Sequence, residues 1–150
     1  GANAMIATSM AVAHAAAAAR KVPLWKYLFD QEKTSSSPFL PLPEIQIFGG
    51  GAHAGGRVDV QDYMVIAIGA ETFAQALEWT ADVYRAAVRL MDDAGKLQGV
   101  ADEGGLWPNF NSNEEALEML MRAIEAAVEA ARAAPRPTAE DVLTDVYVTY

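Results

Sequence analysis

Apolar residues recur at intervals of three and four in two long stretches of the chain. The stripe of the first stretch is Phe73, Leu77, Thr80, Tyr84, Val88 and Met91, and that of the second is Leu117, Leu120, Met121, Ile124 and Val128. This spacing places side chains on one face of a helix. Ser112, with Glu115 three residues later, forms a capping box, which is typical of a helix start. The pattern predicts one helix from Phe73 to about Gly95 and another opening at Ser112.

Two short apolar runs precede these helices. The first covers residues 45–48 and ends at three consecutive glycines, 49–51. The second covers residues 63–68, and its nearly continuous apolar character is typical of a strand covered on both faces. We therefore expect two strands followed by two helices, and residues 141–150 are compatible with a terminal strand. These are too few strands to close a barrel.

The first 44 residues have a different character. Residues 2–20 are rich in alanine and predict a helix, and a short helix is expected over 23–29 with proline at its first position. The alanine stretch is shorter than a bilayer span, which favours a soluble helix. The proline-rich stretch 30–44 predicts a linker and a domain boundary. Because the chain begins at Gly1 and not at methionine, we expect a processed product, an expression remnant or a piece of a longer chain.

Composition excludes several classes of function. The 150 residues include no cysteine, which rules out a disulfide scaffold, a cysteine zinc site and a thiol nucleophile. The formal net charge of -9 argues against a nucleic-acid or anionic-membrane partner. A hydrophobic content of 52% is typical of a globular protein. The absence of cysteine fits a reducing compartment, so we expect a cytoplasmic protein.

Two polar positions lie next to the expected strands. His53 follows the first strand in a glycine-rich turn, where it is either a ligand-facing imidazole or an exposed loop histidine. Asp62 begins the second strand beside Gln61, and its carboxylate is either a solvated edge group or faces a site at the strand end. Asp59 shares that face if the strand extends back.

The segment Asp102-Glu103-Gly104-Gly105 is the most suggestive element for chemistry. It is either an acidic turn or a carboxylate held between flexible backbone and the apolar wall of Trp107-Pro108. An apolar wall favours the protonated form and would make the carboxyl a proton donor. The sequence contains no phosphate-binding glycine motif, no zinc-ligand spacing and no nucleophile elbow.

Several segments in register resemble motifs of the enolase family (phosphopyruvate hydratase). Gly1-Ala2-Asn3-Ala4 and the following helix resemble the glycine-alanine-asparagine-alanine helix of the family. Gly50-Gly51-Ala52-His53-Ala54-Gly55 resembles its histidine loop, and Gln61-Asp62-Tyr63-Met64 resembles its Gln-Glu-Phe-Met element. Residues 101–109 resemble its Gly-Asp-Glu-Gly-Gly-Phe-Ala-Pro-Asn loop. The agreement covers roughly residues 1–130.

The resemblance implies an α/β fold in two parts. Residues 1–40 would be the end of an α+β capping domain and a linker. Residues 41–150 would be the strand-strand-helix-helix start of an incomplete enolase-type α/β barrel.

The resemblance also implies a lyase of glycolysis that dehydrates 2-phosphoglycerate to phosphoenolpyruvate. Glu103 would be the general acid that protonates the departing hydroxide, and His53, Gln61 and Asp62 would bind the small phosphorylated hydroxy-acid substrate. Magnesium is implied as the cofactor, with unknown ligands, because most metal carboxylates and the base lysine of the family lie beyond this chain. A homo-oligomer is expected.

Two departures from the family pattern suggest an enolase-like paralogue. Asp62 stands where the family usually has glutamate, which retracts the carboxylate by about 1.5 Å. Gly49 stands where an asparagine usually precedes the double glycine. The isolated chain is expected to be inactive. The alternative function is that of a non-catalytic, truncated enolase-like chain acting as an interaction or oligomerisation piece.

Overall fold

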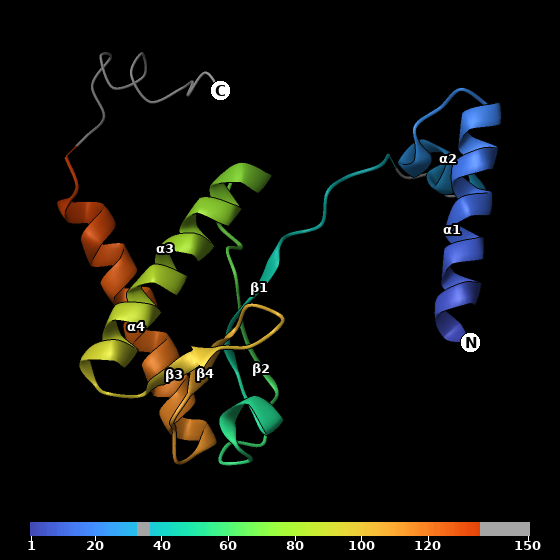
Figure 1. The fold of residues 1–150 in the computed structure, drawn as a ribbon. Helices are drawn as coiled ribbons and strands as arrows, with labels where there is room; N and C mark the ends of the chain where they lie inside the picture. Colours follow the sequence, from blue (N-terminus) through green and yellow to red (C-terminus); the bar gives the residue numbers. More distant parts are fainter. Residues whose placement is uncertain (33–36, 136–150) are drawn as a thin grey trace, which may run out of the picture. The chain divides into compact units, whose positions relative to one another are not determined.

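The structure is a computed structural model that describes residues 1–32 and 37–135 (Figure 1). The chain divides into two compact units, Gly1–Pro41 and Leu42–Tyr150. The strand expected over residues 141–150 lies outside the described residues.

The first unit consists of two helices, α1 (Ala2–Ala19) and α2 (Leu24–Gln31), which confirm the two expected in this region. Lys21 ends α1 because its φ of 55° lies in the left-handed region. Pro23 directly precedes α2 instead of occupying its first turn. Within the described residues, α1 is the one helix that is long and apolar enough to cross a membrane. Its sequence predicts a stretch too short for a span, but the length of α1 does not exclude one. A single such helix is weak evidence for a membrane segment, since signal sequences and the core helices of soluble proteins pass the same test.

The second unit contains a four-stranded sheet in the order β2-β1-β4-β3 (Figure 1). Its strands are β1 (Glu44–Gly49), β2 (Asp62–Ile66), β3 (Leu97–Val100) and β4 (Leu106–Pro108). β1 pairs antiparallel with β2 and parallel with β4, while β3 and β4 form an antiparallel pair. These four strands do not close a barrel, which matches the expectation of an incomplete one.

The expected order of two strands followed directly by two helices is wrong. β3 and β4 lie between the helices, so the order is strand-strand-helix-strand-strand-helix. Both strands are short, and β3 contains Gly99 while β4 ends at Pro108, two residues that weaken a strand pattern. The acidic motif therefore forms the turn between two paired strands and is not a connection between helices.

The two long helices are α3 (Phe73–Asp93) and α4 (Asn113–Ala133), and they pack against each other. Thr72 caps α3 by accepting a hydrogen bond from the backbone N–H of Gln75. Ser112 caps α4 in the same way, with 3.2 Å between its hydroxyl and the N–H of Glu115, so the predicted helix start is confirmed.

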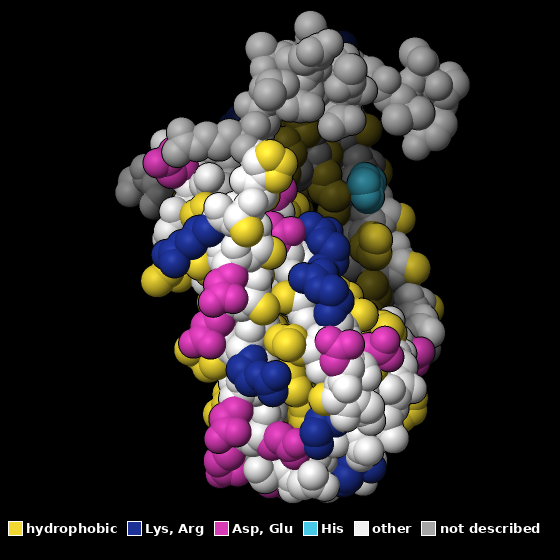
Figure 2. All heavy atoms as spheres, turned by 90° about the vertical axis from the view of Figure 1, so that its left-hand side faces the viewer, with side chains coloured by type: hydrophobic (Ala, Val, Ile, Leu, Met, Phe, Trp, Pro, Cys, Tyr) yellow, Lys and Arg dark blue, Asp and Glu magenta, His cyan; other side chains and the backbone are white. Residues whose placement is uncertain are grey.

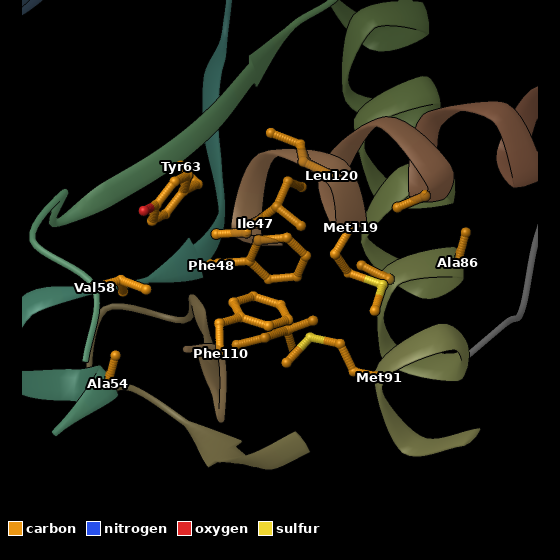
Figure 3. Close-up of a cluster of buried hydrophobic side chains, with 14 of the residues drawn as sticks. Ile47, Phe48, Ala54, Val58, Tyr63, Ala86, Met91, Phe110, Met119 and Leu120 are labelled. Carbon is orange, nitrogen blue, oxygen red and sulfur yellow. The ribbon is translucent and has the colours of Figure 1, made fainter. Parts of the chain in front are cut away.

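The core lies between the sheet and these helices (Figure 3). Phe48 of β1 and Phe110 are fully buried, and their rings meet edge to face with centroids 5.2 Å apart. Met91 and Met119 bring α3 and α4 into the same cluster. The buried end of β1 thus fixes the loop that follows this strand, and β4 fixes the turn that precedes it. On the outer surface, acidic, basic and apolar side chains are interspersed (Figure 2).

Candidate functional site

The loop after β1 brings His53 and the start of β2 to one end of the sheet. His53 lies on a short 3-10 helix, Gly51–Ala54. Gly50 donates a backbone hydrogen bond to the carbonyl of Gln61 across 2.6 Å. A Cβ atom at position 50 would lie 1.8 Å from the carbonyl oxygen of Val60, so only glycine permits this approach. The close contact between the two backbone segments therefore requires glycine in this turn.

The acidic motif is a tight turn between β3 and β4. Backbone hydrogen bonds join Ala101 to Gly105 and Gly104 to Ala101, each across 2.8 Å. Tyr84 of α3 donates a further hydrogen bond from its hydroxyl to the carbonyl of Gly104. Burial raises the pKa of Tyr84, so its phenol stays protonated and able to donate at neutral pH. The turn that presents Glu103 is thus held by both the hairpin and the helix.

His53 and Glu103 meet across the end of the sheet. The Nε2 atom of His53 lies 3.2 Å from Oε1 of Glu103. The side chains are 28% and 42% exposed, so both remain accessible to a small molecule. The ring of Trp107 stands edge to face with the imidazole, with centroids 6.3 Å apart. This arrangement can exchange a proton with a group that lies next to the carboxylate.

Gln46 is part of this site, and the sequence interpretation missed it. Its Nε2 atom donates one hydrogen bond to Oδ1 of Asp62 and another to Oε1 of Glu103, across 2.5 and 3.2 Å. A signal was present in the sequence. Gln46 is a polar residue between Ile45 and Ile47, and alternation along a strand directs it away from the face that those residues share.

An open hollow of about 790 Å³ lies in front of these groups. β1, β2, α3 and the acidic turn surround it, and its polar lining includes Gln46, Gln61, Asp62, Tyr84, Arg85 and Glu103. Three of the four predicted site residues therefore line one hollow. His53 does not line it, but it reaches the hollow through its contact with Glu103.

The described residues do not form a complete magnesium site by themselves. Residues 1–32 and 37–135 contain no group of three or more histidine, aspartate or glutamate side chains placed to hold a metal ion. Asp62 and Glu103 come together, but the amide nitrogen of Gln46 donates to both of them. The space between these two carboxylates is thus filled by a hydrogen-bond donor.

Comparison with known proteins identifies the family to which the chain belongs. Residues 37–133 match the family described as enolase, C-terminal TIM barrel domain. Enolase 1 of Desulfitobacterium hafniense (strain Y51) is 48% identical over 128 residues, which are 85% of this chain and 28% of that protein. The chain therefore belongs to the enolase family, as its motifs indicated. It spans just over a quarter of the length of this relative.

Proposed function

We propose that this chain supplies one half of the active site of an enolase-type lyase, which dehydrates 2-phosphoglycerate to phosphoenolpyruvate. The observation that supports the proposal most strongly is the convergence of Glu103 and Asp62 on one hollow, with His53 in contact with Glu103. Hydroxide is a poor leaving group, and a carboxyl at the edge of the hollow can protonate it as the C–O bond breaks.

In this proposal Glu103 is the general acid. Its turn is rigidly held and its side chain is exposed toward the hollow, so the acid is fixed while the substrate can still reach it. His53 holds one carboxylate oxygen of Glu103 and contacts the leaving side of the substrate. Gln61 and Asp62 form the wall opposite α3 and orient the substrate by hydrogen bonding.

The remaining parts of the site must come from elsewhere. Arg85 is the one cationic residue in the described lining of the hollow, and it is paired with Asp82 across 2.5 Å. A phosphorylated substrate and its magnesium ions need further ligands, and so does removal of the α-proton. We propose that these groups lie outside this chain, and that the enzyme works in the cytoplasm as a homo-oligomer.

The test compares the isolated 150-residue chain with a completed enzyme. We define the completed enzyme as a chimera of the Desulfitobacterium relative. In this chimera, the present sequence replaces the matching 128 residues of the relative, and the rest of the relative is kept. With 2-phosphoglycerate and magnesium, the completed enzyme should form phosphoenolpyruvate and the isolated chain should not. The unmodified relative is the control. Product formation by the isolated chain would contradict the half-site proposal, and a folded but inactive completed enzyme would contradict the lyase assignment.

A second candidate function is assembly with another copy of the chain. An apolar hollow of about 470 Å³ is formed by β2, α3 and α4. β2 also occupies the end of the strand order, which leaves an edge able to pair with another strand. Light scattering of the isolated chain during size-exclusion chromatography tests the assembly function, whereas the activity assay above tests the lyase proposal. A dimer favours the assembly function, and a folded monomer argues against it.

A further inference from the structure

Gln46 connects the two carboxylates of the site, and nothing in the family motifs above assigns it a role. We propose that Gln46 is a positioning residue, which compensates for the short side chain of Asp62 and orients Glu103 so that its Oε2 atom is free to react. This inference rests on the proposed lyase function for its kinetic consequences. The geometry on which it depends is independent of that function.

Gln46 and Asp62 differ in side-chain length and in their positions along the paired strands. In the register of β1 and β2, Gln46 pairs with Met64, whereas Asp62 pairs with Gly49. The two side chains are therefore not directly opposite, and they must reach along the strands to meet. The long glutamine side chain spans this offset and still donates to Oδ1 of the short Asp62 across 2.5 Å. An asparagine at position 46 would retract the amide by about 1.5 Å and lose this contact.

The two carboxylate oxygens of Glu103 have different surroundings. Oε1 receives the hydrogen bond from Gln46 and also lies 3.2 Å from Nε2 of His53. Both nitrogens therefore lie beside the same carboxylate oxygen, and the one from Gln46 donates a hydrogen bond to it. Oε2 has no hydrogen bond to any residue in the described part of the chain. Gln46 and His53 thus hold the carboxyl by one oxygen and leave the other for the substrate.

Gly105 lies next to the side-chain amide of Gln46. A Cβ atom at this position would lie 2.4 Å from Oε1 of Gln46 and 3.1 Å from the backbone nitrogen of Gly49. The backbone at Gly105 is not in the left-handed region, so its φ angle does not demand glycine. The missing side chain makes room for the amide of Gln46. The second glycine of the acidic motif is therefore explained by the placement of Gln46.

The kinetic test exchanges one methylene between the two partners in the completed enzyme. Gln46→Asn and Asp62→Glu alone should each lower kcat by about 10- to 100-fold, with KM changed less than about threefold, because each moves a group by about one bond length. The double variant Q46N/D62E restores the combined length toward residue 62, although not the reach to Glu103, and should therefore recover part of the lost kcat. A merely structural role does not predict this recovery.

Two further variants complete the kinetic test. Gly105→Ala, which pushes the amide of Gln46 aside without altering it, should lower kcat as Gln46→Asn does. Gln98→Asn is the matched control, since Gln98 hydrogen-bonds Arg57 outside the hollow, and its kcat should be unchanged. An unchanged kcat in Gln46→Asn, or additive losses in the double variant, would overturn the proposal.

A spectroscopic measurement keeps the inference separate from the lyase assignment. In the ¹⁵N-labelled chain, the side-chain amide of Gln46 should change its chemical shift when Asp62 is replaced by Asn and when Glu103 is replaced by Gln. The amide of Gln98 should not respond. If the completed enzyme is folded but makes no phosphoenolpyruvate, the lyase proposal fails while this measurement still decides whether Gln46 joins the two carboxylates. If the chemical shift of the Gln46 amide is unchanged by both substitutions, the inference is contradicted.

Discussion

The hydroxyl of Tyr84 donates a hydrogen bond to the carbonyl of Gly104 across 2.9 Å, and this contact joins α3 to the turn that presents Glu103. Tyr84 and Gly104 are 20 residues apart in the chain, so this is a tertiary contact. It fixes the turn that carries Glu103 relative to the rest of the hollow. The raised pKa of Tyr84, which burial causes, keeps the donor protonated well above neutral pH.

Tyr84→Phe removes this hydroxyl and leaves the ring in place. We expect the free energy of unfolding to fall by about 1 kcal/mol, the usual net value of one hydrogen bond. In the completed enzyme kcat should fall several-fold, because the turn loses a restraint beside the acid. Tyr27→Phe is the matched control, since Tyr27 lies in the first unit and packs under Arg20 through its ring. Urea unfolding and steady-state kinetics check both effects, and equal behaviour of the two variants would refute the role of Tyr84.

Asn113 fastens the loop before β2 to the start of α4. Its Oδ1 atom accepts hydrogen bonds from the backbone N–H groups of Asp59 and Val60 and from the hydroxyl of Tyr63. Asn113→Ala should destabilise the chain by about 1–3 kcal/mol, because several donors lose their acceptor together. The amide protons of Asp59 and Val60 should then exchange faster with solvent. Asn3→Ala, at an exposed position of α1, should change neither property. Unaltered exchange in Asn113→Ala would show that the loop is held by other contacts.

The ion pair between Lys96 and Glu115 predicts a dependence of stability on pH. The hydrogen bond from Lys96 is the main cause that lowers the pKa of Glu115 below its ordinary value of 4.5, and the backbone N–H of Asn111 adds to it. A lowered folded-state pKa stabilises the fold above the ordinary value, and this contribution is lost as pH falls through the lowered value. The chain should therefore become less stable in acid.

Glu115→Gln tests this linkage. The variant should be less stable than the original chain at pH 7, and the difference should shrink well below pH 4.5, where the original carboxyl is itself protonated. Lys26→Met is the control, because the pair of Lys26 and Asp30 is nearly half exposed and such pairs contribute about 0.3–0.5 kcal/mol. Urea midpoints measured across this pH range decide the matter. A stability difference that does not vary with pH would count against the pair.

The long helices could be predicted from the sequence because their signals are local. The stripes of α3 and α4 and the cap at Ser112 depend only on residues three and four apart. β3 and β4 could not be predicted in this way. They are four and three residues long, and they exist because Leu106 pairs with Phe48 and Leu97 with Pro108. Such pairing is a tertiary effect that periodicity does not contain.

The residues of the candidate site also differ in whether local sequence signals could reveal them. His53, Asp62 and Glu103 stood out because each is an acid or imidazole beside glycine or at a strand end. Gln46 did not, since a single amide inside a strand is usually a solvent-facing residue. Its importance depends on the offset between β1 and β2 and on the space left by Gly105, and both arise only when the chain is folded.

The most direct test of the central claim is the kcat of Glu103→Gln in the completed enzyme, beside that of Asp102→Asn. The two substitutions remove the same charge from neighbouring exposed residues of one turn, but only Glu103 contacts His53 and lines the hollow. If Glu103 is the general acid, its replacement should lower the rate of phosphoenolpyruvate formation by about 100- to 10,000-fold, while Asp102→Asn stays near the original rate. A Glu103→Gln enzyme that retains its activity would contradict the account.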